Sequence, residues 1–222
     1  MKVPVIKRIL DAQERIAAEL KQLFDEKGIL VINLMSSPGA GKTSILEKTI
    51  EALKDKLRLA VIEGDVQTSL DAERIARYGI LTVQINTYGA CHIDGNMVKE
   101  ALPDLNLDEI DILFVENVGN LVCPAEFKVG EDYKVMILSV PEGDDKPAKY
   151  PLMFRESSVL LINKIDLLPF LECDLEKINK EALKVNPHLK NFPVSAKTGE
   201  GLEGWYDWLI EAFKAKNHEK KN

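Results

Sequence analysis

Residues 36–43, with the sequence SSPGAGKT, have the residue types of a phosphate-binding loop. Apart from serine in place of the first glycine, they match the pattern G-x-x-x-x-G-K-[ST], which joins a strand to a helix. Gly39 and Gly41 let successive backbone amides face the phosphates, and the positive end of the following helix adds to the attraction. Lys42 can reach the outer phosphates, and the hydroxyl of Thr43 can bind Mg²⁺. The residues predicted to bind a nucleotide here are Ser37, Pro38, Gly39, Ala40, Gly41, Lys42, Thr43 and Ser44.

A second motif, N-K-I-D at residues 163–166, ends a later apolar run. The carboxylate of Asp166 can accept two hydrogen bonds from the N1 and exocyclic amino groups of guanine, whereas adenine offers no matching pair of donors. The motif therefore predicts specificity for GTP. In this feature the sequence resembles the P-loop GTPases, which also carry an S-A-K element. The predicted base-site residues are Asn163, Lys164, Asp166, Ser195, Ala196 and Lys197.

Two acidic elements close apolar runs, E-G-D at residues 63–65 and E-N-V-G at residues 116–119. We expect Asp65 and Glu116 to bind Mg²⁺ together with Thr43, directly or through water, and the amide of Gly119 to face the third phosphate. The alternative for each acid is an N-cap or turn role. Lys42, Asp65, Glu116 and Gly119 are the predicted catalytic residues. No obvious glutamine follows to orient the attacking water, so intrinsic GTP hydrolysis should be slow.

Soft metal ligands occur at three positions: Cys91 and His92 are adjacent, and Cys123 lies four residues beyond Gly119. Their spacing alone is a weak metal signal, because no C-x-x-C or H-x-x-x-H pattern brings two ligands together; buried structural thiols are the alternative. If they do meet, a tetrahedral zinc site is one ligand short, and the same ligands also suit nickel. The side chains expected to be structural or on the surface are Cys173, His188 and His218.

Short apolar runs alternate with segments of helical periodicity. The runs expected to form strands are residues 29–35, 57–62, 80–85, 112–115, 135–140, 159–162 and 192–194. The segments expected to be helical are residues 5–26, 45–53, 71–78, 97–102, 175–183 and 202–213. This alternation predicts an α/β fold with a mostly parallel sheet and helices on both faces, and the motifs fall at the carboxyl ends of the strands, where such sheets bind ligands.

The chain of 222 residues has 29 basic and 36 acidic side chains, a net charge of -7 and a pI near 5.2. Nucleic-acid binding through bulk charge therefore has no support. The sequence has no stretch of 18 apolar residues and no signal-peptide pattern at its start, so we expect a cytoplasmic protein with no membrane partner. We expect an amphipathic helix in residues 1–28, a GTPase domain in 29–216 and a flexible tail in 217–222.

Across nearly its whole length the sequence resembles the HypB family, GTPases that assist nickel insertion into nickel-iron hydrogenases. The elements that carry the resemblance, in the family's order, are SSPGAGKT, EGD, GACHID, ENVGNLVCP, EGDDKPAKYP and NKID. The resemblance implies a P-loop NTPase fold of the SIMIBI type, with nickel or zinc on Cys91, His92 and Cys123. It also implies a homodimer formed or strengthened by GTP, in which Lys149 could reach the nucleotide of the other subunit. The implied partners are a HypA-type nickel metallochaperone and the hydrogenase large-subunit precursor.

Other functions fit parts of this sequence, among them that of a nucleotide-independent metal-binding protein. A GTPase chaperone for another metallocentre, such as urease or a cobalamin enzyme, is the alternative within the class, and the Cys91–His92 pair argues against it. A small-molecule kinase needs arginines that clamp its acceptor, and N-K-x-D disfavours it. The starting segment MKVPVIKRILDAQER has no histidine-rich or cysteine-rich motif, so nickel storage is not expected. We further hypothesise that loss of the third phosphate relaxes the loop at Gly119 and moves Cys123.

Overall fold

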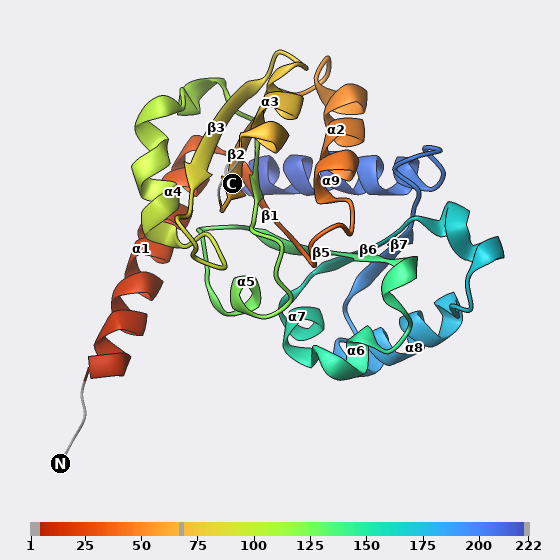
Figure 1. Ribbon diagram of the computed structural model, residues 1–222. Helices are drawn as coiled ribbons and strands as arrows, with labels where there is room; N and C mark the ends of the chain where they lie inside the picture. Colours follow the sequence, from red (N-terminus) through yellow and green to blue (C-terminus); the bar gives the residue numbers. More distant parts are fainter. Residues whose placement is uncertain (1–4, 67–68, 220–222) are drawn as a thin grey trace.

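A computed structural model describes residues 5–66 and 69–219, with the backbone alone for residues 5–11 and for residue 219. Within these residues seven parallel strands form one sheet in the order β3-β2-β4-β1-β5-β6-β7 (Figure 1). The strands are β1 (Leu30–Ser36), β2 (Leu59–Asp65), β3 (Leu81–Asn86), β4 (Ile112–Glu116), β5 (Tyr133–Ser139), β6 (Val159–Asn163) and β7 (Lys190–Pro193). Each overlaps one of the seven predicted runs, so the predicted parallel α/β sheet is confirmed.

Burial explains why these strands appear in the sequence as continuous apolar runs. Every residue of β1, β4 and β6 is buried, because helices cover both faces of a parallel sheet. The two edge strands are more exposed, and β3 has exposed residues at both ends. β1 lies at the centre of the sheet, between β4 and β5. The loop that follows it is therefore flanked by strand ends on both sides.

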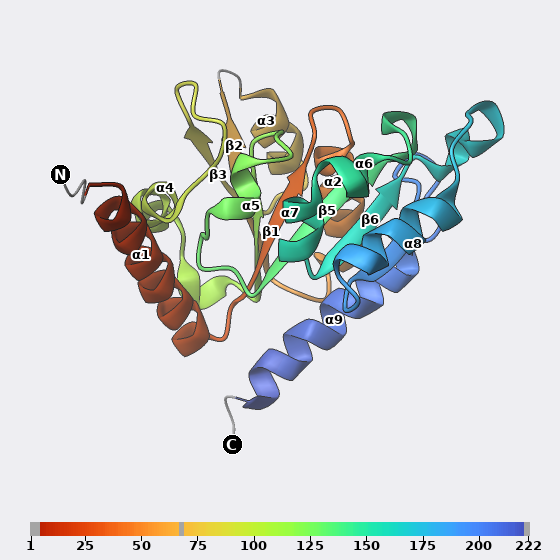
Figure 2. The same cartoon turned by 90° about the horizontal axis from the view of Figure 1, so that it is seen from below.

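Helices form a layer on each face of the sheet (Figures 1 and 2). The α-helices are α1 (Val5–Lys27), α2 (Lys42–Leu53), α3 (Leu70–Ala76), α4 (Gly95–Ala101), α5 (Cys123–Glu126), α6 (Lys146–Lys149), α7 (Pro151–Glu156), α8 (Leu175–Val185) and α9 (Leu202–Glu219). The 3-10 helices are η1 (Leu102–Asp104), η2 (Leu107–Glu109), η3 (Val140–Glu142) and η4 (Ile165–Phe170). One face packs against α2, α3 and α9. The other packs against α1 and α4 near β2, and against α5, α7 and α8 near β6.

Two segments add detail that the sequence pattern did not give. Residues 142–151 include α6, whose Pro147 is buried, and they end where Pro151 starts α7. Proline suits the first turn of a helix, where its missing N–H is not needed. Residues 217–219 continue α9 instead of forming a tail, and Asn217 donates from Nδ2 to the carbonyl of Gly28 at 3.3 Å. Residues 1–4 and 220–222 lie outside the described residues. None of the described helices is long and apolar enough to cross a membrane.

An ionic cluster fastens α1 to α9 around Asp132, whose side chain is 12% exposed. Its Oδ2 accepts a hydrogen bond from the Val31 amide at 2.8 Å and lies 2.6 Å from Lys216 Nζ on α9. Its Oδ1 lies 3.1 Å from Lys21 Nζ on α1. Both helices are thereby held at the amino end of the sheet, opposite the predicted nucleotide site.

Candidate functional site: a nucleotide cavity beside a cysteine-histidine cluster

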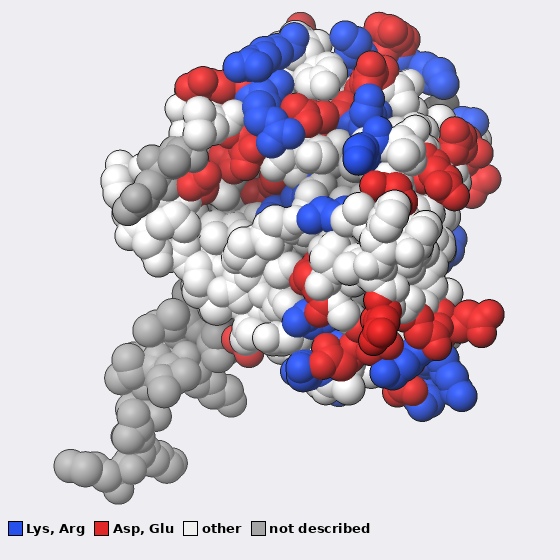
Figure 3. All heavy atoms as spheres, turned by 45° about the vertical axis from the view of Figure 1, so that its right-hand side comes forward, with Lys and Arg blue, Asp and Glu red and all other residues white. Residues whose placement is uncertain are grey.

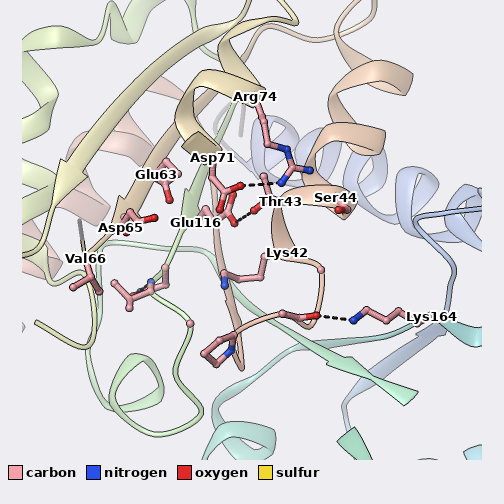
Figure 4. Close-up of a pocket in the computed structure, with 17 residues that line it drawn as sticks. Lys42, Thr43, Ser44, Glu63, Asp65, Val66, Asp71, Arg74, Glu116 and Lys164 are labelled. Carbon is pink, nitrogen blue, oxygen red and sulfur yellow. Dashed lines mark hydrogen bonds and ion pairs between the residues drawn. The ribbon is translucent and has the colours of Figure 1, made fainter. Parts of the chain in front are cut away.

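The loop between β1 and α2 has the shape of a phosphate cradle. Gly39 and Gly41 both adopt positive φ, 74° and 100°. A Cβ on Gly41 would lie 2.4 Å from Asn163 Nδ2, so only glycine fits this position. Lys42 donates from Nζ to Ser36 Oγ at 3.2 Å, and Figure 4 shows its side chain extending into the space below the acidic residues. The positive φ of the two glycines and the position of Lys42 at the cavity are compatible with a phosphate-binding loop.

A cavity of about 560 Å³ opens above this loop. Its walls are the loop itself, the ends of β2 and β4, and the first turn of α3 (Figure 4). Its volume is within the range of small-molecule sites, about 300–1,000 Å³. The predicted residues Pro38, Lys42, Thr43, Asp65, Glu116 and Gly119 all line it.

A second cavity, of about 490 Å³, adjoins the first on the side of β6 and β7. Among its lining residues are Gly41, Ser44, Asn163, Lys164, Asp166, Ala196 and Lys197. Asp166 lies at its wall and accepts a hydrogen bond at Oδ1 from the buried hydroxyl of Ser195 at 2.6 Å. That bond fixes the orientation of the carboxylate that is predicted to read guanine.

The first two residues of N-K-I-D brace the phosphate loop. Asn163 donates from Nδ2 to the carbonyl of Ala40 at 2.9 Å and accepts at Oδ1 from the amide of Ala196 at 3.0 Å. Lys164, with a positive φ of 65°, donates from Nζ to the carbonyl of Gly39 at 2.6 Å. Asn163 therefore uses both ends of its amide to connect the phosphate loop with the S-A-K element, and it also lines the second cavity.

The acidic side chains gather at the ends of β2 and β4. Thr43 donates from Oγ1 to Glu116 Oε1 at 2.7 Å, and the strand register pairs Glu116 with Glu63. Carboxylate oxygens of Glu63, Asp65 and Asp71 lie within 4.8 Å of one another. Thr43 and Glu116 are thus in contact as predicted, whereas Asp65 groups with two acids that the sequence analysis did not select.

Burial sets the electrostatics of these acids. It raises the pKa of Glu63 to about 8, with a further contribution from the negative charge of Glu116. It also raises the pKa of Glu116, against the opposing effect of Lys42. Oε2 of each glutamate is buried and has no hydrogen-bond partner among the described residues. Buried carboxylate oxygens without partners are what a hard divalent cation such as Mg²⁺ would satisfy, so the residues fit that ion.

The loop after β4 touches the phosphate loop through Gly119. A Cβ at this glycine would lie 3.0 Å from the Cα of Pro38, at the limit of contact. The absent side chain therefore lets the two backbones approach, and the predicted position of Gly119 beside the phosphates is consistent with the structure.

The two cysteines and the histidine meet in space, although 31 residues separate His92 from Cys123. The Sγ atoms of Cys91 and Cys123 lie 2.7 Å apart, and Cys91 Sγ lies 3.7 Å from His92 Nδ1. The imidazole stacks on Phe127 with ring centroids 3.8 Å apart.

Protonation at this cluster follows from its surroundings. Burial lowers the pKa of His92, which favours the neutral imidazole that metals bind. The hydrogen bond with Cys91, followed by burial, raises the pKa of Cys123 to about 11. A soft metal ion would displace these thiol protons on binding.

Comparison with known proteins agrees with this geometry. A family model described as "CobW/HypB/UreG, nucleotide-binding domain" matches residues 30–193. The chain belongs to the CobW/HypB/UreG family. It is 50% identical over 207 residues to the hydrogenase maturation factor HypB of Rhizobium leguminosarum bv. viciae, which covers 93% of this chain and 69% of that protein.

Two solved structures of HypB share the fold. That of Archaeoglobus fulgidus is 36% identical with a TM-score of 0.86, and the match covers 91% of this chain and 99% of the other. That of Helicobacter pylori, described as a complex with nickel, is 37% identical with a TM-score of 0.86, and the match covers 92% and 96%. The predicted P-loop NTPase fold of the SIMIBI type and the predicted family are therefore confirmed, and the protein has the nucleotide-binding domain of the CobW/HypB/UreG family.

Other predictions for this CobW/HypB/UreG protein are decided by burial and contacts. Cys173 packs against the core beside α8, and His188 and His218 are exposed, as predicted. Lys149 is exposed and forms an ion pair with Asp145.

Three site residues were missed, Glu63, Asp71 and Glu142. Glu63 had a signal, because it stands two residues before Asp65 and therefore on the same face of the strand. Glu142 accepts a hydrogen bond from the hydroxyl of Ser37 over a separation that no local pattern reveals.

Proposed function

We propose that the protein is a GTP-hydrolysing metallochaperone that binds nickel, or zinc, and assists nickel insertion into a nickel-iron hydrogenase. The observation that carries this proposal is the meeting of Cys91, His92 and Cys123 at the same edge of the sheet as the phosphate loop. A cytoplasmic carrier needs such an arrangement, because the nucleotide can then influence how firmly the metal is held. The relatives named as hydrogenase maturation factors support the choice of recipient.

GTP would lie across both cavities, with its phosphates on the loop and its base beside Asp166. The loop amides and Lys42 carry the charge of the phosphates, in a protein whose net charge is -7. The face shown in Figure 3 mixes basic with acidic side chains rather than gathering them into a basic patch. Local hydrogen bonding, not overall charge, therefore selects the ligand, and nucleic acid is not among the proposed partners.

Thr43, Asp65 and Glu116 would hold Mg²⁺, which, when bound, neutralises charge on the second and third phosphates. Lys42 and the amide of Gly119 would hold the third phosphate in place while water attacks. No obvious glutamine follows the E-N-V-G element to orient that water, so we expect unassisted hydrolysis of GTP to GDP and phosphate to be slow.

Nickel is the cargo of the cysteine-histidine cluster. Three ligands from one chain leave a position for water, a partner residue or a ligand from a second subunit, which is suited to exchange. Cys123 stands four residues beyond Gly119, and Gly119 abuts Pro38. Loss of the third phosphate would relax this loop and move the thiol of Cys123. The affinity for nickel would therefore differ between the GTP-bound and the GDP-bound protein.

A homodimer strengthened by GTP fits the surface around the site. Apolar side chains at the carboxyl edge are exposed to water, including Tyr88 (90%) beside the cysteine-histidine cluster and Phe170 (80%) after N-K-I-D. A second copy would cover them, and the exposed Lys149 would then be free to reach the nucleotide of that copy. A HypA-type nickel metallochaperone and the hydrogenase large-subunit precursor are the proposed partners for loading and delivery.

The test measures phosphate release from GTP, nickel affinity by competition with a chromogenic chelator, and mass in solution with GDP or a non-hydrolysable GTP analogue. Lys42→Ala should abolish hydrolysis. Cys123→Ser should weaken nickel binding at least about tenfold, since one of three ligands is lost. Cys173→Ser is the matched control and should leave nickel affinity unchanged. Equal nickel affinity in the two cysteine variants would overturn the proposed metal site, and equal affinity of the native chain for nickel with either nucleotide would overturn the coupling.

A further inference from the structure

The side chain of Asn117, which is 1% exposed, lies between the nucleotide cavity and the cysteine-histidine cluster. Its Oδ1 accepts two hydrogen bonds, from the amide of Ile93 at 2.8 Å and from the amide of Val118 at 3.0 Å. Its Nδ2 donates to Asn33 Oδ1 at 3.1 Å. The side-chain amide of Asn117 therefore connects the loop after β3 with the loop after β4.

Each of the two bonded amides belongs to one of the sites. Val118 precedes Gly119, whose backbone touches Pro38 of the phosphate loop. Ile93 follows His92 directly. The side chain of Asn117 thus connects Val118, the neighbour of Gly119, with Ile93, the neighbour of His92.

Ile93 is also held against the acidic edge of the cavity. A Cβ on Gly64 would lie 2.4 Å from Ile93 Cδ1, so the isoleucine occupies the space beside that glycine. Gly64 stands between Glu63 and Asp65. Ile93, the residue next to His92, therefore contacts both the end of β2 and the loop after β4.

We propose that Asn117 is the positioning residue that transmits the nucleotide state to the nickel site. This rests on the proposed function, in which nickel affinity depends on the nucleotide. A movement of Gly119 toward or away from a third phosphate carries the amide of Val118 with it, and Oδ1 of Asn117 passes that movement to Ile93 and His92. Asn33 holds Nδ2 of Asn117 in place, so the side-chain amide of Asn117 would rotate about that hydrogen bond.

The presence of Asn33 supports a role beyond stability. It is fully buried in the middle of β1, and its Nδ2 has no hydrogen-bond partner among the described residues. A buried polar group with an unsatisfied donor costs stability that an apolar side chain would not. This chain carries the asparagine pair in spite of that cost, as is expected if the orientation of Asn117 matters for function.

The experiment measures nickel affinity of the full chain with GDP and with a non-hydrolysable GTP analogue, and takes the ratio of the two. Coupling between two sites is typically about 5- to 150-fold, so the native chain should show a ratio of about fivefold or more. Asn117→Ala removes the acceptor of both amides and should bring the ratio to within about twofold of one. Asn117→Asp keeps the acceptor oxygen and should retain part of the ratio.

Asn186→Ala is the matched control. Asn186 also spans three backbone groups through its amide, the carbonyls of Phe154, Arg155 and Ser157, but it contacts neither site. It should leave the ratio at the native value whatever it does to stability. If Asn117→Ala does not fold, Asn33→Ala removes the anchor alone and should lower the ratio.

The possible results separate the two hypotheses. A native ratio that survives in Asn117→Ala, or in Asn33→Ala where the first variant does not fold, overturns the role of Asn117 and leaves the proposed function standing. A ratio of one in the native chain overturns the coupling in the proposed function, and the role of Asn117 with it. Loss of the ratio in the Asn186→Ala control as well would mean that any loss of packing has this effect, which also overturns the role.

Discussion

Glu63 makes the stability of the nucleotide-free and metal-free protein depend on pH. Its pKa is raised by burial to about 8, above the ordinary value of 4.5. Between these values the folded chain carries one more proton than the unfolded chain, so the free energy of unfolding falls as pH rises. Glu63→Gln mimics the protonated side chain and should remove this contribution.

The magnitude follows from the shift. Each pH unit between the two pKa values changes the free energy of unfolding by about 1.4 kcal/mol, less close to the folded pKa. Between pH 6 and pH 8 the native chain should therefore lose roughly 2 kcal/mol relative to Glu63→Gln. The variant should be more stable than the native chain by roughly 2 kcal/mol at pH 6 and by roughly 4 kcal/mol at pH 8.

The assay is urea unfolding in the presence of a chelator, followed by the fluorescence of the buried Trp205 and Trp208. Working at pH 6 and above keeps the protein away from its pI near 5.2. Glu172→Gln, at an exposed glutamate, is the control and should track the native chain. Titrating groups that do not interact with Glu63 cancel in the comparison. A difference between native and Glu63→Gln that stays constant from pH 6 to pH 8 would refute the reasoning.

Further predictions concern the cradle, the base site and the ionic cluster. Gly41→Ala places a Cβ 2.4 Å from Asn163 Nδ2 and should lower GTP hydrolysis about a hundredfold, whereas Gly79→Ala, with a positive φ but open space, should leave it unchanged. Asp166→Asn replaces one acceptor by a donor, so competition binding should show GTP affinity reduced about 10- to 100-fold and affinity for xanthosine triphosphate increased. Asp132→Ala removes the acceptor shared by two lysines and a backbone amide, and urea unfolding should show a loss of about 2 kcal/mol, while an unchanged midpoint would contradict the role given to the cluster.

Much of the fold could be predicted because a strand buried on both faces has no polar alternation. The runs at β1, β4 and β6 are apolar throughout or nearly so, and each was located to within a residue or two. Helices α5, α6 and α7 have four to six residues, too few for a helical period to show. The end of α9 was missed because it is polar, and the contact of Asn217 with Gly28 joins the two ends of the sequence.

The residues that line the two cavities include those predicted to bind the nucleotide, because they belong to local motifs in which spacing along the chain already determines which side chains lie together. The cysteine-histidine cluster could not be derived from spacing, since it depends on the order of strands. Cys91 follows β3 and Cys123 follows β4, and the order β3-β2-β4 leaves only β2 between them. Nothing in the residues around either cysteine states that order. The resemblance to a family supplied the pairing, and the folded chain shows the physical reason for it.

The central place of β1 has a consequence for mechanics. Acids from β2 and β4 lie on one side of its loop, and N-K-I-D and S-A-K from beyond β6 and β7 lie on the other. A nucleotide that occupies both cavities would therefore link the loops after β2 and β4 to the loops after β6 and β7. Its departure would unlock loops more than a hundred residues apart in the sequence, such as those near Asp71 and Ser195. Amide hydrogen exchange should then become faster in the loops on both sides of β1 at the same time.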